Sequence, residues 1–153
     1  KFRSMKRIIL IFCAIIIAVV SLSAQNAIRW RMTVKMTSDT EGVVTLRALV
    51  GDGWHLYGTS LPENGPKPTV FSFDGSAGVK FTGDLTPSRK PLTVDDKMFG
   101  MKLSWWDANV EFSRNFKLVK KEGARIVADI DFMGCNDKTC LPPKKQTLTY
   151  QFK

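Results

Sequence analysis

Two cysteines near the end of the chain, Cys135 and Cys140, are the residues whose type and spacing could do chemistry. Four residues separate them, and two prolines follow shortly after the second cysteine. Cysteines this close at the tip of a hairpin can reach the roughly 5.5–6 Å between Cα atoms that suits a disulfide. The pair could therefore be a structural crosslink, a redox-active dithiol or part of a metal site.

These three alternatives differ in what they need from the rest of the chain. A crosslink that closes so short a loop contributes only about 2 kcal/mol on a loop-entropy basis, and a domain of this size has a core without it. Disulfides at loop tips are exposed and exchange readily, which favours a redox role. A metal site is incomplete, because two thiolates without a nearby histidine leave the coordination unfinished, so we predict neither a metal nor a cofactor. Spacing alone leaves the crosslink and the redox role open.

The first segment, residues 1–24, has the three parts of a cleavable secretory signal peptide. A basic start after Met5, the expected initiator, precedes thirteen apolar residues at 8–20, and small residues follow. Thirteen residues of helix rise only about 20 Å, less than the ~30 Å of hydrocarbon in a membrane, which argues against the alternative of an uncleaved anchor. We predict cleavage after Ser23 or Ala24 and a periplasmic location.

The charge of the chain gives little support to nucleic-acid binding. The formal charge is +9, but residues 1–24 hold four of the 23 basic residues and none of the 14 acidic ones, so the mature domain at 25–153 carries +5. This charge is mild and spread along the chain, unlike that of nucleic-acid-binding proteins. Loss of the leader also removes Cys13, which leaves Cys135 and Cys140 in a compartment that permits disulfides.

The elements that must position these cysteines are short strands. Apolar and polar residues alternate over the nine positions 28–36, a period of two that is typical of a strand with one buried face. Strands are predicted at 28–36, 44–50, 54–57, 69–73, 79–82, 109–118, 125–132 and 147–152. Seven to nine short strands, frequent turn residues and no clear amphipathic helix predict a single all-β domain, an immunoglobulin-like antiparallel β-sandwich with the cysteines on a hairpin tip.

Three segments, in the same order along the chain, resemble those of a known family. Gly134-Cys135, a short polar loop and Cys140-Leu141-Pro142-Pro143 are similar to the active-site segment of the N-terminal periplasmic domain of the DsbD thiol:disulfide interchange proteins. The run Asp52-Gly53-Trp54-His55-Leu56-Tyr57 resembles a strand start of that family. The run Asp96-Lys97-Met98-Phe99-Gly100 stands where the family has a cap loop that covers the disulfide. The resemblance covers roughly 27–153 and favours the redox role.

The resemblance implies an immunoglobulin-like domain that acts as a monomeric protein-disulfide reductase in a relay. A membrane-embedded thiol reductase of the DsbD or CcdA kind would reduce its dithiol. The domain would then reduce periplasmic partners, such as disulfide isomerases or the thioredoxin-like proteins of cytochrome c maturation. By position, Cys140 would form the mixed disulfide with a partner and Cys135 would resolve it. The residues that would cover or line the disulfide are Asp96, Met98, Phe99 and Tyr57.

The chain departs from the family pattern in three places. The spacing between the cysteines is one residue shorter than in the member it most resembles. Lys97 stands where that member has a second acid in the cap, which removes a proton-handling group there. The sequence ends at Lys153, without a membrane reductase, so we expect either a stand-alone domain or a truncated product.

The sequence leaves a non-catalytic alternative open. The adjacent Trp105 and Trp106 could form a stacking platform in a module that binds a glycan or a protein, with the cysteines as a structural disulfide. Adjacent strand residues point to opposite faces, however, so one of the two indoles is expected to point inward. His55, the single histidine, is expected to be a packed residue rather than a catalytic base, and Tyr57 is consistent with ordinary core as well as with the disulfide pocket.

Overall fold

The computed structural model describes residues 27–153, so the predicted signal peptide lies outside the described residues. These residues form eleven strands and no helix, and hence none that could cross a membrane. In chain order the strands are β1 (Ile28–Met36), β2 (Glu41–Val50), β3 (Trp54–Tyr57), β4 (Val70–Ser72), β5 (Val79–Pro87), β6 (Leu92–Asp96), β7 (Met101–Trp106), β8 (Val110–Leu118), β9 (Arg125–Phe132), β10 (Gly134–Asn136) and β11 (Lys144–Gln151).

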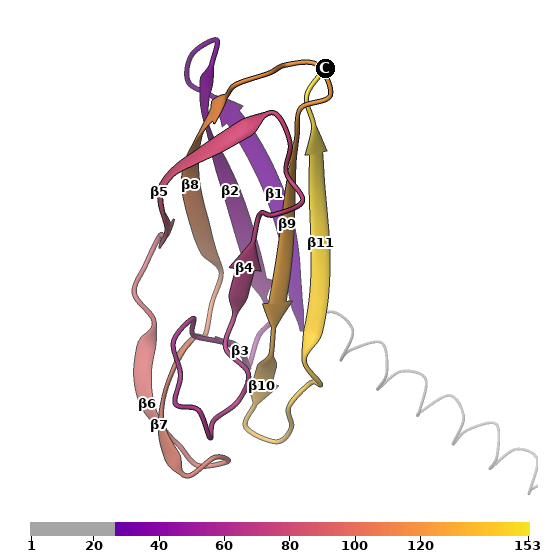
Figure 1. Ribbon diagram of the computed structural model, residues 1–153. Helices are drawn as coiled ribbons and strands as arrows, with labels where there is room; N and C mark the ends of the chain where they lie inside the picture. The colour runs from indigo at the N-terminus through magenta and orange to yellow at the C-terminus, as the bar shows by residue number, and fades with distance from the viewer. Residues whose placement is uncertain (1–26) are drawn as a thin grey trace, which may run out of the picture.

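The strands form two facing sheets and a third sheet at one end. The order β1-β2-β8-β5 makes one layer of the sandwich, and β11-β9-β4 makes the other. The third sheet, β10-β3-β7-β6, lies at the lower end of the molecule in Figure 1. Every strand pair is antiparallel, so the predicted all-β antiparallel sandwich is confirmed.

The core lies between the two facing sheets and follows directly from the alternation in the sequence. In β9, Ile126, Ala128 and Ile130 are fully buried, while the residues between them are not. Aromatic rings fill the centre of the sandwich, where Trp30 packs against Phe112 with ring centroids 5.8 Å apart. Burial of this apolar surface is the main source of stability for such a domain.

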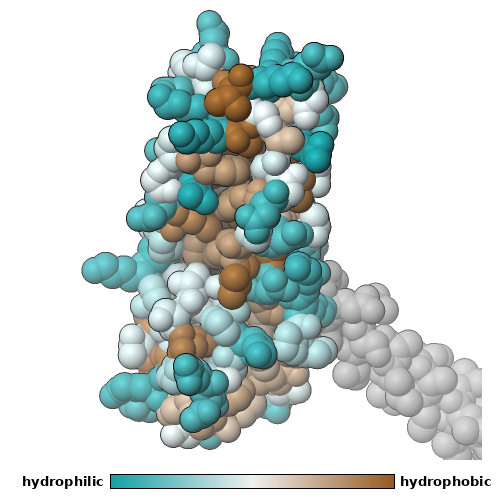
Figure 2. All heavy atoms as spheres, in the orientation of Figure 1, coloured by the Kyte–Doolittle hydropathy of each residue, from teal (hydrophilic) through white to brown (hydrophobic). Residues whose placement is uncertain are grey.

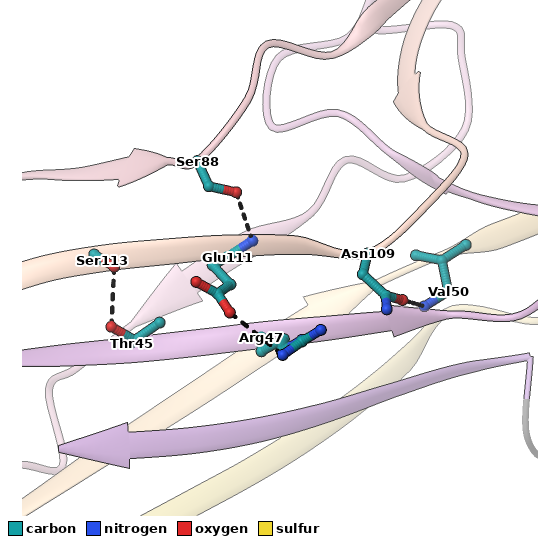
Figure 3. Close-up of polar contacts among 7 residues, drawn as sticks. All are labelled: Thr45, Arg47, Val50, Ser88, Asn109, Glu111 and Ser113. Atoms are coloured by element: carbon teal, nitrogen blue, oxygen red, sulfur yellow. Dashed lines mark hydrogen bonds and ion pairs between the residues drawn. The ribbon is translucent and has the colours of Figure 1, made fainter.

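Polar contacts along one sheet fix the register of β2 against its neighbour β8 (Figure 3). The hydroxyls of Thr45 and Ser113 lie 3.0 Å apart across the two strands. Arg47 and Glu111 form an exposed ion pair at 3.6 Å, which contributes little to stability. Asn109, at the start of β8, accepts a hydrogen bond of 2.9 Å from the last backbone N–H of β2. This last contact joins the segment between β7, a strand of the third sheet, and β8 to the end of β2 in the sandwich.

The sandwich is open along one side, between the edge strands β4 and β5. Figure 2 shows apolar surface down the middle of this face. A pocket of about 330 Å³ lies here, lined in part by Phe71, Leu85 and Phe112. Further along this open side, the guanidinium carbon of Arg114 lies 5.2 Å from the centroid of the Phe81 ring. The same guanidinium donates a hydrogen bond to a backbone carbonyl of β5. The open side is thus covered in part by a cationic side chain rather than by another strand.

The structure corrects the sequence prediction in the number and extent of strands. β6, β7 and β10 were not predicted, β5 extends to Pro87, and β11 begins at Lys144. β6 and β7 escape detection because their burial does not alternate: β6 buries the carboxylate of Asp96, and β7 buries Leu103 and Trp106, which are three residues apart. β10 has three residues, too few for any periodicity to show.

Candidate functional site

The strand that carries Cys135 continues the core strand β9 into the third sheet. A single residue, Met133, separates β9 from β10. Beyond it the chain leaves β11 and pairs with β3, so that Cys135 lies directly opposite His55. The cysteine-bearing hairpin tip therefore belongs to a different sheet from its stem, and the site lies at the end of the molecule where β10, β3, β7 and β6 lie side by side (Figure 1).

The two cysteines form a disulfide across a tight hairpin. Their Cα atoms are 4.0 Å apart and pair as an isolated antiparallel bridge. The backbone N–H of Asn136 donates to the carbonyl of Thr139 at 2.9 Å, and that of Leu141 donates to Gly134 at 2.9 Å. The side chain of Asn136 accepts two further backbone N–H groups, at 2.9 and 2.8 Å. Asparagine is suited to this position because its amide oxygen can cap a turn locally.

The sulfurs differ in accessibility. Cys135 is 1% exposed and packs with the buried Tyr57 and Leu103. Cys140 is half-buried and lies at the border of the same cluster. Of the two cysteines, Cys140 is thus the more exposed.

Gly134 allows the cysteine strand to approach its neighbours. A Cβ at this position would overlap the side chain of Ile28 and lie 3.1 Å from the backbone carbonyl of His55. A larger residue would require the buried Ile28 side chain to move and would crowd β3 slightly. This close approach gives a physical reason for the glycine that precedes the first cysteine.

The turn between β6 and β7 covers the disulfide. Asp96, the last residue of β6, is buried and accepts hydrogen bonds from the backbone N–H groups of Met98 at 2.7 Å and Phe99 at 2.9 Å. Gly100 closes the turn with φ at 64°, in the left-handed region that glycine adopts without strain. The sulfur of Met98 lies 3.2 Å from that of Cys140, a direct contact between two sulfur atoms, because a disulfide carries no hydrogen to donate.

Tyr57 connects this cap to the cysteine cluster. It is fully buried, its hydroxyl donates to the second carboxylate oxygen of Asp96 at 3.2 Å, and its ring meets Phe99 edge-on at 6.1 Å. Burial, the charge of Asp96 and this hydrogen bond all raise the pKa of Tyr57 well above its usual value. The phenol is therefore a fixed neutral donor that holds the carboxylate in place.

His55 is packed, as the sequence predicts, but it is packed inside the site. Its ring stacks on Trp105 with centroids 4.1 Å apart and meets Tyr57 edge-on at 5.1 Å. Its Nε2 atom is buried and has no hydrogen-bond partner within residues 27–153. Burial lowers the pKa of His55, and the charges of Asp96, Asp137 and Asp107 oppose that shift without reversing it.

The two adjacent tryptophans point to opposite faces, which confirms the expected alternation. Trp106 is buried in the sandwich core, where it meets Phe112 edge-on and donates from Nε1 to the carbonyl of Arg89 at 3.0 Å. Trp105 is half-buried and one face of its indole is covered by His55. The pair therefore does not form the open stacking platform that a glycan-binding module would use.

A pocket of about 450 Å³ opens between the cysteine hairpin and the cap. The aromatic side chains of His55, Tyr57 and Trp105 form one part of its wall, and Cys135 forms another. Its remaining lining is mostly polar and acidic, with three carboxylates and one ammonium: Asp95, Asp96, Asp137 and Lys97. No group of three potential metal ligands gathers anywhere in the described part of the chain. The pocket is suited to a protein loop or side chain that approaches the disulfide.

The structure brings all six predicted site residues into one cluster. Cys135, Cys140, Met98, Phe99, Asp96 and Tyr57 lie together at the end of the molecule. His55 and Trp105 also line the pocket, although neither was predicted as a site residue. A signal for His55 was present, because residues two apart on a strand share a face, and Tyr57 was already a pocket candidate.

The chain is similar to several known proteins. The family model of the N-terminal domain of the thiol:disulfide interchange protein DsbD matches residues 21–151. The N-terminal periplasmic domain of ScsB from Proteus mirabilis has a TM-score of 0.57 and 18% identity, over 80% of this chain and 45% of that one, and it shares the fold. The reduced DsbD N-terminal domain of Neisseria meningitidis has a TM-score of 0.49 and 16% identity, over 84% of this chain and 93% of that one.

A third structure contains the DsbD N-terminal domain of Neisseria meningitidis in complex with the PilB N-terminal domain. It has a TM-score of 0.47 and 17% identity, over 78% of this chain and 80% of that one. No curated protein sequence matches the chain.

Proposed function

Because the chain belongs to the family of DsbD N-terminal domains, we propose that it is a thiol–disulfide interchange domain whose Cys135–Cys140 pair cycles between disulfide and dithiol. In the reduced state it passes two electrons to the disulfide of a partner protein and becomes oxidised. In the oxidised state it receives two electrons from a donor and becomes a dithiol again. The domain is thus a protein-disulfide reductase within a relay.

The proposed relay runs across a membrane and ends in the periplasm. Residues 1–24 direct export, and the mature domain works outside the cytoplasmic membrane. The electron donor is a membrane-embedded thiol reductase of the DsbD or CcdA kind. The acceptors are periplasmic thioredoxin-like proteins or disulfide isomerases, including those of cytochrome c maturation. Family membership supports this route.

The observation that carries the proposal is the unequal burial of the two cysteines. Cys140 is half-buried beneath the cap, whereas Cys135 is 1% exposed. In the reduced domain the Cys140 thiolate attacks the partner disulfide, a mixed disulfide forms, and one partner thiolate leaves. The Cys135 sulfur then attacks Cys140, the bond between Cys140 and the partner breaks, and the second partner thiolate leaves.

The cap regulates this access. Met98 contacts the Cys140 sulfur, and Asp96 holds the backbone of the turn in the covering conformation. Small oxidants are thus kept from Cys140 until a partner displaces the turn. Because Lys97 stands in place of a second acid at the tip of the cap, the cap acts by covering the disulfide rather than by transferring protons.

A measurement of the reduction potential separates this function from a structural disulfide. We expect a value of about −200 to −270 mV, in the range of redox-active dithiols. The purified oxidised domain is equilibrated with glutathione or dithiothreitol mixtures, and the free thiols are counted. A value below about −300 mV would mark a permanent crosslink and would support the non-catalytic alternative.

A trapping experiment tests the roles of the two cysteines. Cys135→Ala leaves Cys140 without its resolving partner, so mixed disulfides with thioredoxin-like proteins should accumulate in a periplasmic extract. The matched control is Cys140→Ala, which leaves one sulfur in a buried position and should trap little. Equal trapping by the two variants, or none by either, contradicts the assigned roles.

A further inference from the structure

One buried nitrogen at the site has no partner in the oxidised protein. His55 is 8% exposed, and its Nε2 atom makes no hydrogen bond to any residue in 27–153. A buried polar atom left without a partner is destabilising. The indole nitrogen of Trp30 also lacks a hydrogen-bond partner among these residues. Trp30, however, lies in the sandwich core, whereas His55 lines the pocket beside the disulfide.

The register of the third sheet places this histidine next to a reacting atom. His55 and Cys135 are directly opposite each other on β3 and β10. Directly opposed residues of an antiparallel pair point to the same face, with Cβ atoms about 4.5–5.5 Å apart. Both side chains line the same pocket. The imidazole is therefore a near neighbour of the buried sulfur.

The redox state decides whether the nitrogen can find a partner there. In the disulfide, the sulfur of Cys135 carries no hydrogen, so it cannot donate to Nε2. Reduction places a thiol hydrogen on that sulfur, and the thiol can then donate to the imidazole. Reduction therefore adds a hydrogen-bond donor at the strand position directly opposite His55.

We propose that His55 is the proton acceptor for Cys135 in the resolving step of thiol–disulfide exchange, an inference that rests on the proposed function. Cys135 is buried against Tyr57 and Leu103 and lines a pocket that contains carboxylates. Both features disfavour its thiolate, and yet the thiolate is the nucleophile. A neutral imidazole beside it removes the proton as the sulfur attacks. The imidazole thus promotes formation of the Cys135 thiolate, which burial disfavours.

The proton and electrons balance in this step. The proton of the Cys135 thiol passes to Nε2 of His55 while the sulfur forms its bond with Cys140. The bond between Cys140 and the partner sulfur breaks, and its electron pair leaves on the partner as a thiolate. The imidazolium then returns its proton to that thiolate or to water. In the reverse direction the thiol of a donor gives its proton to the neutral imidazole as its sulfur attacks Cys140, the bond between Cys140 and Cys135 breaks, and His55 passes the proton to the departing Cys135 sulfur.

The groups packed around His55 fit this role. Its own strand contributes Tyr57, which stays neutral, and β7 contributes the stacked Trp105. The charged groups that face it come from the cap hairpin, the turn after β7 and the cysteine loop: Asp95, Asp96, Lys97, Asp107 and Asp137. Burial lowers the pKa of His55 and so keeps it neutral and able to accept, while Asp96, Asp107 and Asp137 stabilise the imidazolium once it forms.

The test separates the attack of Cys140 from that of Cys135. The reduced domain is mixed with dithiobis(nitrobenzoate), which releases a coloured thiolate when Cys140 attacks and a second one when Cys135 resolves the mixed disulfide. His55→Phe keeps an aromatic ring against Trp105 but has no nitrogen. We expect an unchanged first phase and a second phase slowed about a hundredfold at neutral pH, the lower end of the gain from a positioned general base.

The pH profile distinguishes proton transfer from a structural role. From about pH 6 to about pH 9 the second phase of His55→Phe should rise with hydroxide concentration, so that its deficit against the unsubstituted domain shrinks. His55→Gln is the second variant, because its amide can form a hydrogen bond but does not take up a proton near neutrality. We expect it to be as slow as His55→Phe.

Two outcomes overturn the inference. One is a second phase in His55→Phe with the rate and pH slope of the unsubstituted domain, and the other is recovery of the normal rate in His55→Gln. Thermal unfolding of each variant shows whether it is folded. If His55→Phe does not fold, the kinetics of His55→Gln alone test the inference. Failure of the proposed function looks different, because the reduction potential of the unsubstituted domain would then lie below the range of redox-active dithiols, whatever the rates of the two phases.

Discussion

The two ends of the molecule are built on different principles. The sandwich buries fourteen residues in one apolar cluster, whereas the cluster at the cysteines has three fully buried members, Tyr57, Leu103 and Cys135. The buried polar or charged side chains of residues 27–153 are His55, Thr69 and Asp96, and all lie at or beside the site. The hydroxyl of Thr69, for example, donates to the backbone carbonyl of Tyr57 at 2.6 Å.

This contrast explains how the domain can change its covalent structure without unfolding. Stability comes from apolar burial in the sandwich, which contains neither cysteine. The site end relies on oriented hydrogen bonds, an aromatic stack and a bond that can open. The following substitutions sharpen or break this contrast, and they are ordered from the largest expected effect to the smallest.

The largest effect is expected from the sandwich core. Phe112→Ala removes a ring that packs against Trp30, Phe71 and Trp106. We expect it to lower the free energy of unfolding by about 3–5 kcal/mol, measured by denaturant titration. The reduction potential of the folded fraction should stay unchanged. A loss below about 1 kcal/mol would break the contrast, because the sandwich would then not carry the stability.

Removal of the disulfide should have a smaller effect. Cys135→Ala combined with Cys140→Ala should abolish exchange and lower the free energy of unfolding by about 2 kcal/mol, the value for so short a loop. The circular dichroism of the sheets should be preserved. A loss as large as that of Phe112→Ala would show that the bond holds the sandwich together and would support a structural disulfide.

Tyr57→Phe removes one hydrogen bond at the site. The carboxylate of Asp96 loses the phenol donor but keeps its two backbone donors, so we expect a loss of about 1 kcal/mol. The raised pKa of Tyr57 adds a signature in alkali: above about pH 10 the unfolded tyrosine loses its proton while the folded one keeps it, so stability falls as pH rises. Tyr57→Phe should lack the part of this loss of stability that comes from Tyr57. An identical dependence of stability on pH in the two proteins would contradict the raised pKa of Tyr57.

The cap should affect rate rather than stability. Met98 is 48% exposed, so Met98→Ala should change the free energy of unfolding by less than about 0.5 kcal/mol. Reduction of the disulfide by dithiothreitol should nevertheless become faster, because the side chain in contact with Cys140 is gone. Val119→Ala, at an exposed valine outside the pocket, is the matched control and should leave the rate unchanged. Equal rates in both variants mean that the turn does not shield the sulfur.

The smallest effect concerns the pH dependence of stability in the oxidised domain. The pKa of His55 is lowered by burial, so below about pH 6.5 the unfolded histidine binds a proton that the folded one does not. Stability therefore falls as the pH drops through this range. The difference in unfolding free energy between the unsubstituted domain and His55→Phe should narrow or reverse on acidification. A difference that is constant with pH contradicts a buried neutral histidine.

Much of the sandwich could be predicted from the sequence because its strands have one apolar face. β1, β2, β8 and β9 alternate clearly, and the predicted boundaries of β1 and β9 match the structure. The third sheet could not be predicted in the same way, apart from β3, whose bounds match the predicted ones. Its strands place Asp96, His55 and Cys135 where a core strand would have apolar residues, so the periodic signal fails where the chemistry lies.

The site residues were found by motif rather than by pattern. Cys135 and Cys140 stand out by type, and the cap was located through its resemblance to a family segment. The stacking of His55 on Trp105 depends on the pairing of β3 with β7, two strands separated by a long connection, and β7 was itself not predicted. Without that pairing the sequence gives no reason to bring the two rings together.

The backbone bridge between the cysteines has a kinetic consequence. Two backbone hydrogen bonds, from Asn136 to Thr139 and from Leu141 to Gly134, do not depend on the bond between the sulfurs. They would hold the thiols adjacent after reduction, so that in the proposed exchange Cys135 acts on a mixed disulfide at a very high effective molarity. The proposed function then implies a short-lived covalent complex with each client and rapid turnover rather than lasting capture.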